Sequence, residues 1–237
     1  MTNKKKCIVL LSGGQDSTTS LYWAIKKFGG GNVVAIGFDY GQKHVKELVQ
    51  AKYISEEIAK VPYMIFPCTG LLGGSSLVNH QVDHNEQHIM NAELPASFTA
   101  GRNALFLTVA AAYGHKWGIT DIVTGVCQTD YSGYPDCRMD FIDSMMNSLS
   151  LGIYGQLYDE EWAESKVKIH TPLMYLTKAE TFKLAKELGC LDVVLEQTMT
   201  DYNGNATIND WGMGKEDNPA SKIRANGYRE AKEKGWI

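Results

Sequence analysis

The sequence predicts a doubly wound α/β fold built on a parallel sheet of five strands. Short apolar runs alternate along the chain with longer segments whose apolar residues recur at helical spacing. This alternation is typical of strand–helix–strand units, which place helices on both faces of a parallel sheet. Polar and glycine-rich motifs follow the apolar runs, at the sheet edge where such folds bind ligands.

The first strand–helix unit carries the clearest chemical signal. Residues 7–11 are an apolar run that predicts a buried strand, Ser12, Gly13 and Gly14 predict a tight turn, and residues 17–28 predict a helix. Such a turn surrounds one cavity with free backbone N–H groups, hydroxyls and the positive end of a helix, which favours phosphate binding. It is not the GxxxxGK[ST] loop, because the lysine and the spacing are absent.

The later elements follow from the same two patterns. We expect strands at residues 33–39, 63–67, 121–125 and 167–171. We expect helices at residues 45–57, 103–117, 138–151 and 178–188. Residues 68–98 form a connection too long to be a plain link in a compact domain. Residues 1–190 are expected to form a nucleotide-binding α/β domain and residues 191–237 a C-terminal helical lid, packed as one unit.

Composition narrows the class of protein. The net charge of -4 over 237 residues argues against a general nucleic-acid-binding protein. No apolar stretch approaches the ~20 residues that span a bilayer, and the start of the chain does not read as a signal peptide. The five cysteines are scattered and odd in number, which favours reduced thiols. We therefore expect a cytoplasmic protein that binds neither membranes nor nucleic acid in general.

Residues 125–138 form the second polar concentration. They hold two aspartates, an arginine, two tyrosines and a Gly-Tyr-Pro turn. One interpretation is an ordinary solvated loop. The other is a pocket for a flat polar heterocycle, in which the tyrosine rings pack on its faces and Asp130 or Asp136 accepts hydrogen bonds from its edge. The residues alone leave both open.

Taken together, the motifs resemble the 7-cyano-7-deazaguanine synthase family, QueC-like pyrophosphate-loop ATPases. In chain order these motifs are Ser12-Gly-Gly-Gln-Asp-Ser17, Tyr40-Gly-Gln-Lys-His44, Glu93-Leu-Pro, Gly101-Arg-Asn103, Thr129-Asp-Tyr-Ser-Gly-Tyr-Pro-Asp-Cys-Arg138, His170-Thr-Pro-Leu-Met174 and Lys178-Ala-Glu-Thr181. The resemblance implies an adenine nucleotide α-hydrolase-like, Rossmann-like fold and a homodimer. It also implies an ATP- and Mg²⁺-dependent carbon–nitrogen ligase that adenylates 7-carboxy-7-deazaguanine, releases diphosphate, and lets ammonia displace AMP. A second adenylation then converts the amide to the nitrile.

The resemblance also implies which residues act. The catalytic residues would be Ser12, Asp16, Ser17, Arg102 and Lys178. ATP would be bound by Leu11, Ser12, Gly13, Gly14, Gln15, Asp16, Ser17, Asp39, Gly101, Arg102 and Lys178. The deazaguanine acid would be bound by Tyr40, Gln42, His44, Asp130, Tyr131, Tyr134, Asp136 and Arg138. Two of these also have a purely structural interpretation, Lys178 on a helix surface and His44 at a helix start.

The chain departs from this family near its C-terminus. Family members carry a zinc site of four cysteines there, and this chain has Asp201, Lys215, Asn218 and Ser221 at the corresponding positions, with no cysteine after Cys190. A four-thiolate site cannot form, so we expect no structural zinc. Our hypothesis is that an ion pair between the first two residues replaces the metal, while the other two cap backbone groups. The alternative is a lid that orders only when a ligand or partner binds.

Smaller departures raise alternatives to the ammonia reaction. Gln128 stands where we expect an acid, Lys43 where we expect arginine, and Ala100 where we expect proline. Residues 153–165 are acidic and aromatic, either a partner site or a solvated helix and loop. These changes are compatible with a related ligase that joins the deazaguanine acid to a protein's N-terminal amine in antiphage defence. A nucleotide-binding pseudoenzyme that serves as a scaffold is a further alternative.

Overall fold

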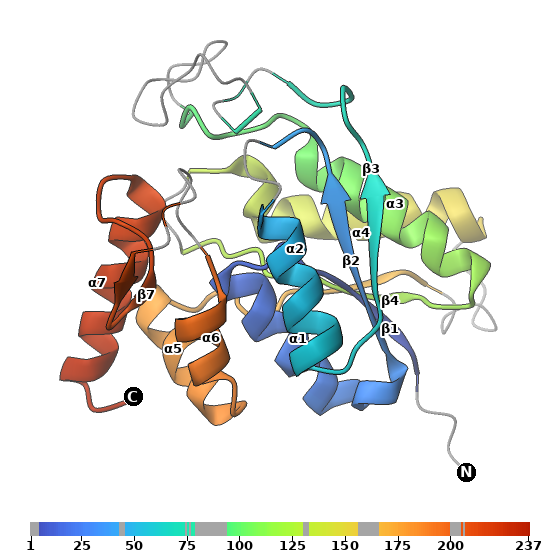
Figure 1. Cartoon of the computed structure of the whole chain (residues 1–237). Helices are drawn as coiled ribbons and strands as arrows, with labels where there is room; N and C mark the ends of the chain where they lie inside the picture. Colours follow the sequence, from blue (N-terminus) through green and yellow to red (C-terminus); the bar gives the residue numbers. More distant parts are fainter. Residues whose placement is uncertain are drawn as a thin grey trace.

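A five-stranded parallel sheet lies at the centre of the computed structural model, which describes residues 5–42, 46–73, 75, 77–78, 94–129, 133–155, 166–199, 205 and 207–237. Its strands, in the order β3-β2-β1-β4-β5, all pair in parallel (Figure 1). Their bounds are β1 Cys7–Leu10, β2 Val33–Asp39, β3 Tyr63–Pro67, β4 Asp121–Val123 and β5 Lys168–His170. The strand order reverses between β1 and β4, the switch point beyond which ligands bind in such sheets.

Helices cover both faces of this sheet: α1 Gln15–Phe28 and α2 Lys46–Lys52 on one, α3 Arg102–Lys116 and α4 Met139–Tyr154 on the other. Beyond α1 pack α5 Lys178–Glu187, α6 Leu191–Gln197 and α7 Pro219–Glu233. Ile8 of β1 packs in a core with α3 and α4, whereas its neighbours Cys7 and Val9 pack in a second core with α1 and α2. Successive strand residues point to opposite faces, so one apolar strand serves both layers. The doubly wound α/β prediction is confirmed.

Most elements lie where the sequence predicts them, with β2 and β3 matching to the residue. The expected strand at 121–125 ends at Val123, because the chain then leaves the sheet and passes close to α1. A Cβ at Gly125 would lie 2.9 Å from the carbonyl oxygen of Asp16 in the first turn of that helix. The expected helix at 45–57 is instead α2 followed by a π-helical segment, Tyr53–Ile58. Short 3₁₀ turns cover Gly30–Asn32 and Pro135–Cys137.

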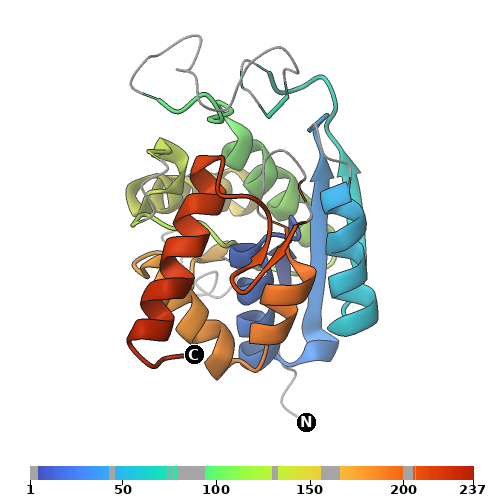
Figure 2. The ribbon, with the colours of Figure 1, turned by 60° about the vertical axis from the view of Figure 1, so that its left-hand side comes forward.

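The C-terminal segment holds elements that the sequence analysis did not resolve. An antiparallel hairpin of β6 Ile208–Asn209 and β7 Gly212–Met213 follows α6, and α7 then runs beside α5 (Figures 1 and 2). Phe182 of α5, Val194 of α6 and Ala231 of α7 share one buried apolar cluster. The division into two units at residue 190 remains a prediction, since α5 and the C-terminal helices share this core.

Arg224 of α7 ties the C-terminal segment together. Its guanidinium is fully buried and donates to the carbonyl oxygens of Trp211 at 3.0 Å, Thr198 at 3.3 Å and Val194 at 2.7 Å. It also donates to the hydroxyl of Thr198 at 2.9 Å. One side chain therefore joins α6, the following chain, the β6–β7 turn and α7. Gly212 is required here, because a Cβ would lie 2.1 Å from the guanidinium.

The hypothesis about the four zinc positions is tested in part. Asn218 caps α7, its side-chain oxygen accepting the N–H of Ser221 at 3.0 Å. The Ser221 hydroxyl is buried and has no partner among the described residues, so it caps nothing. Asp201 lies outside the described residues, and its pairing with Lys215 remains a prediction. Within the described part of the chain, no group of three or more His, Cys, Asp or Glu side chains could hold a metal ion.

None of the helices in the described part of the chain has the length and apolarity that a bilayer crossing requires.

Candidate functional site

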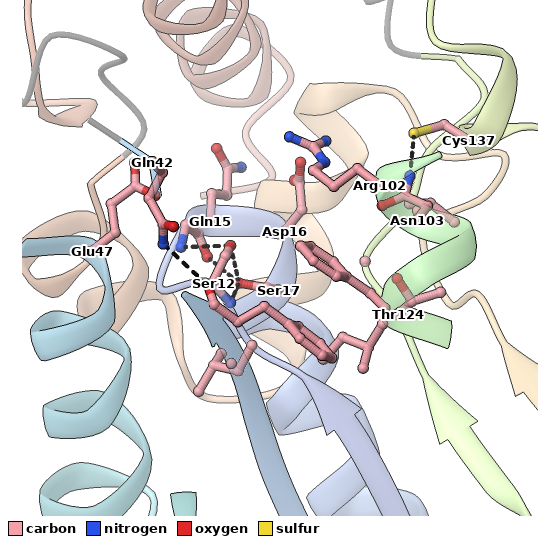
Figure 3. A pocket seen from close by; sticks show the side chains of 18 of the residues that line it. Ser12, Gln15, Asp16, Ser17, Gln42, Glu47, Arg102, Asn103, Thr124 and Cys137 are labelled. Atoms are coloured by element: carbon pink, nitrogen blue, oxygen red, sulfur yellow. Dashed lines mark hydrogen bonds between the residues drawn. The ribbon is translucent and has the colours of Figure 1, made fainter. Parts of the chain in front are cut away.

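A cavity of about 340 Å³ opens at the carboxyl ends of β1, β2 and β4 (Figure 3). Loops after these three strands and the first turns of α1, α2, α3 and α5 form its walls. Of the residues implied by the resemblance, those that line it are Leu11, Ser12, Gly14, Gln15, Asp16, Ser17, Tyr40, Gln42, Arg102, Tyr134 and Lys178. The switch point of the sheet thus gathers these residues from five separate stretches of the chain.

The loop after β1 forms the floor of the cavity. The hydroxyl of Ser17 accepts the N–H of Ser12 at 3.2 Å and donates to the carbonyl of Gly14 at 3.1 Å, which holds the loop closed. The two serine hydroxyls lie 3.1 Å apart. Gly13 has a φ of 88°, and a Cβ there would lie 2.9 Å from the carbonyl oxygen of Glu47 in α2. Only glycine allows this turn and this close packing of α2 on the loop.

An ion pair crosses from the loop to α5. Lys178 donates to both carboxylate oxygens of Asp16, at 3.0 and 2.8 Å, and the two side chains are 12% and 30% exposed. Lys178 is the first residue of α5, which begins with a capping box between Thr177 and Glu180. The cap fixes the helix start, and the helix start aims the ammonium at the loop. Lys178 is therefore part of the cavity and not a surface lysine.

A second cation enters from α3. Arg102 begins that helix directly after Gly101, whose φ of 75° requires a left-handed turn. Its guanidinium lies 5.9 Å from the ring of Tyr134 and acts electrostatically on the Tyr40 phenol. Burial lowers the pKa of Arg102, but Tyr40, Tyr134 and Asp136 raise it more, so the guanidinium stays charged. The cavity therefore presents two fixed positive charges, as a polyanionic ligand requires.

Two of the implied acid-binding residues form one wall near the end of β2. The Gln42 side chain accepts the N–H of Tyr40 at 3.0 Å and donates to the carbonyl of Phe38 at 3.1 Å. These bonds hold Gln42 against the cavity. Burial raises the pKa of Tyr40, while Arg102 lowers it, and the result is a phenol that stays neutral.

Other implied residues lie behind the cavity wall. Asp136 is buried and accepts the N–H of Asn103 at 3.3 Å, so its carboxyl supports the start of α3. Arg138 is exposed at the start of α4. The Asp39 carboxylate accepts the N–H of Gly41 at 3.2 Å. Neither these three nor Gly13 and Gly101 line the cavity. His44, Asp130 and Tyr131 lie outside the described residues, as do Lys43 and most of residues 153–165.

Several lining residues were not expected from the sequence. They are Leu10, Ile36, Gly37, Phe38, Glu47, Leu48, Leu77, Asn103, Phe106, Thr124, Gly125, Val126, Cys127, Cys137 and Met199. Most are apolar or small and come from strand ends and helix starts. In the sequence, apolar residues at such positions predict burial in the core and do not indicate a binding site. Phe38 and Phe106 stack with ring centroids 4.1 Å apart, a flat apolar surface beside the loop. Glu47 is the unexpected ionisable acid, and its position soon after the Tyr40–His44 motif was the available signal.

Glu47 and Gln15 stand out by their environment. Burial raises the pKa of the Glu47 carboxyl to about 7, although Arg102 opposes the shift. Glu47 is drawn on the far side of the loop from Arg102 (Figure 3). Gln15 is 2% exposed, and neither atom of its amide has a hydrogen-bond partner among the described residues. Buried polar groups without partners are costly and are kept where a ligand pairs them.

Gln128, the residue expected to be acidic, does not line the cavity. It is exposed, and its side-chain oxygen accepts the N–H of Met139 at 3.1 Å at the first residue of α4. An amide suffices for this cap. The substitution at this position therefore changes a helix start and not the floor of the site.

Comparison with known proteins finds one matching family and close relatives that share a single name. The model of the family described as queuosine biosynthesis protein QueC matches residues 6–232. A protein named 7-cyano-7-deazaguanine synthase from Wolinella succinogenes is 43% identical over 226 residues, which cover 94% of this chain and 92% of that protein. One of the same name from Chromobacterium violaceum is 45% identical over 202 residues, 84% of this chain and 81% of that protein. Among solved structures, NMN synthetase from Francisella tularensis covers 98% of this chain and 87% of its own, with 13% identity and a TM-score of 0.47.

Proposed function

This chain belongs to the QueC family, and from that premise we propose what it does. It converts 7-carboxy-7-deazaguanine to 7-cyano-7-deazaguanine with ATP and ammonia. The observation that carries the proposal is one cavity lined by the phosphate loop, by two cations and by aromatic side chains. A cavity of about 340 Å³ that combines these charged groups with flat apolar rings suits a nucleotide and a bicyclic acid.

The first half-reaction activates the acid. A carboxylate is a poor electrophile, so its oxygen attacks the α-phosphorus of ATP, the bond to the β-phosphate breaks, and diphosphate leaves. Backbone N–H groups of the loop, the Ser12 hydroxyl and the start of α1 would bind the departing diphosphate. Lys178 and Arg102 would offset the charge that develops on it. In the free protein Lys178 is held by Asp16, which keeps its ammonium in the cavity until phosphate arrives.

The residues present fit Mg²⁺. This ion commonly binds through one or two carboxylates together with substrate phosphates and water, and Asp16 supplies such a carboxylate beside the phosphate loop. Asp16 would hold Mg²⁺, which when bound would neutralise charge on the phosphates. Loading the site would then free Lys178 from Asp16 for the ligand.

The second half-reaction joins nitrogen to the activated acid. Ammonia forms a bond to the acyl carbon, the bond to AMP breaks, and an amide results. Adenylation of the amide oxygen and loss of AMP would then give the nitrile. Gln42, Tyr40 and the stacked Phe38 and Phe106 are available to hold the bicyclic acid, with its flat rings against the apolar surface of the two phenylalanines.

The amide-ligase alternative drew on Gln128, Lys43, Ala100 and residues 153–165. Of these, Gln128 caps α4 at the surface, whereas Lys43 and most of residues 153–165 lie outside the described residues. A scaffold has no need of the ion pair between Asp16 and Lys178 in a ligand-sized cavity. We further propose that this member of the family has no four-cysteine zinc site, which the absence of cysteine after Cys190 supports, and that it forms a homodimer.

One experiment separates these proposals. The purified protein is incubated with 7-carboxy-7-deazaguanine, ATP, Mg²⁺ and ammonium, and products are followed by mass spectrometry. We expect AMP, diphosphate and the nitrile, each dependent on the acid. Diphosphate without nitrile would favour the amide ligase, and no acid-dependent diphosphate would refute the adenylating activity altogether.

A further inference from the structure

We propose that Glu47 is the general base of the amine-transfer step, the group that takes the proton from the nitrogen attacking the acyl adenylate. The inference rests on the proposed function and adds a catalytic residue to it. When ammonia attacks, a C–N bond forms, the bond between the acyl carbon and the AMP oxygen breaks, and one surplus proton is left on nitrogen. AMP departs as an anion, and the Glu47 carboxylate accepts the proton.

The position of Glu47 follows from how α2 packs. Its carbonyl oxygen lies 2.9 Å from where a Cβ of Gly13 would be, so the first turn of α2 rests on the phosphate loop. The Glu47 side chain lines the same cavity as Ser12 and Asp16. The acyl carbon of an adenylate is two bonds from the α-phosphorus, so it sits next to this loop. A carboxyl on the adjoining turn is within reach of a nitrogen that attacks there.

The other candidate carboxyls are already engaged. Asp16 is the second acidic residue in the lining, and both of its oxygens bind Lys178. Asp39 accepts a hydrogen bond from its own turn, and Asp136 supports the start of α3. Among the residues that the structure describes, Glu47 is thus the lining carboxyl without a hydrogen-bond partner. A base must have such a free oxygen.

The electrostatic surroundings suit a proton acceptor. Burial raises the pKa of Glu47 to about 7, so the carboxyl can take up and return a proton near neutral pH. Within the described residues, the groups that act on it electrostatically are the Arg102 guanidinium, which opposes the rise, and the neutral Tyr40 phenol. The pair of Asp16 and Lys178 lines the same cavity. Full pairing with Arg102 would hold the pKa low and leave a weak base.

The test compares the two half-reactions in Glu47→Gln. Acid-dependent diphosphate release in a single turnover measures adenylation, and amide formation at fixed adenylate measures amine transfer. We expect adenylation within about threefold of wild type and amine transfer slower by ~10²–10⁴-fold. The wild-type rate of amine transfer should rise with pH through an inflection near 7, which the variant lacks. Glu57→Gln, the same change at an exposed site on the same helical segment, should alter neither step.

The outcomes distinguish this inference from the proposed function. If wild type shows no acid-dependent diphosphate release, the proposed function fails first. If wild type works and Glu47→Gln loses both half-reactions equally, or neither, Glu47 is not the base. Glu47→Asp keeps the carboxylate on a shorter arm and should recover part of the amine-transfer rate with the pH inflection. A Glu47→Asp variant that loses adenylation together with amine transfer would assign Glu47 to structure instead.

Discussion

Replacing Gln15 by leucine should make the free protein more stable and its nucleotide binding weaker. The Gln15 side chain is 2% exposed, and its amide oxygen and nitrogen have no partner among the described residues. It also lines the cavity directly beside Asp16. Leucine has a similar size and no polar atom, so Gln15→Leu removes the unpaired amide without opening a large void.

The magnitude follows from the cost of an unpaired buried group. That cost is about 1–3 kcal/mol, so the variant should gain roughly 2 kcal/mol in the free energy of unfolding. For a domain of this size each kcal/mol moves the melting temperature by about 2–4 °C, which predicts a rise of roughly 4–8 °C. If the amide pairs with the phosphates of ATP, its loss should weaken ATP binding by about 10–100-fold.

The assay needs a melting curve of the free protein and a titration of ATP by calorimetry. Thr18→Val is the matched control, because the Thr18 hydroxyl is equally buried and unpaired on the same helix but does not line the cavity. It should raise the melting temperature and leave ATP affinity unchanged. A Gln15→Leu protein that melts lower than wild type, or that binds ATP as tightly, would refute the reasoning.

Further predictions concern Lys178 of the ion pair with Asp16, Arg224 of the C-terminal segment, the Glu47 carboxyl and the zinc content. Lys178→Met should slow acid-dependent diphosphate release by ~10²–10³-fold, and wild-type single turnovers in this variant would show that its ammonium does not face the phosphates. Arg224→Met should lower the free energy of unfolding by about 2–5 kcal/mol in urea melts, because it leaves buried carbonyls unpaired. An unchanged urea midpoint would contradict a stabilising role for these hydrogen bonds. The raised pKa of Glu47 means that its stability contribution is full below pH 4.5 and is lost as pH rises through about 7. Glu47→Gln should therefore exceed wild type by about 1–3 kcal/mol in unfolding free energy at pH 8.5 and match it at pH 4.5. Metal analysis of the purified protein should find zinc far below one per chain, and a stoichiometric amount would overturn that expectation.

The fold class and the tight turn at residues 12–17 could be predicted from the sequence because both depend on local patterns; phosphate binding at that turn remains a prediction. The alternation of apolar runs and helical segments predicts a doubly wound α/β fold. Residues 12–17 supply the hydroxyls and backbone N–H groups of the loop within six consecutive positions. Lys178 needed the fold to separate two interpretations, since a lysine on a helix start is ordinary until a carboxylate lies 2.8 Å away. The family resemblance supplied the expected ligand. Of its implied residues, some line the cavity, some lie behind its wall, and His44, Asp130 and Tyr131 lie outside the described residues.

What the sequence could not predict depends on distant contacts. Glu47 is one acid in a polar helix, and its environment arises only when α2 packs on the turn at Gly13. Arg224 looks like a surface arginine in a charged stretch, yet it is fully buried. Gln128 shows the opposite error, because a change of residue type at a motif edge suggested altered chemistry where the structure has a helix cap. In each case the contact that decides the role of the residue is made by a different element of the fold.

The buried hydrogen bonds that Arg224 makes with Val194, Thr198 and Trp211 have a consequence for how the enzyme matures in the cell. A guanidinium bonded to three main-chain oxygens assembles from polypeptide alone, with no thiol to oxidise and no ion to be delivered. We expect such a C-terminal segment to fold at the rate of the rest of the chain. Neither a shortage of trace metals nor an excess of peroxide should slow it. Growth conditions that starve a thiolate-capped relative should leave this one competent.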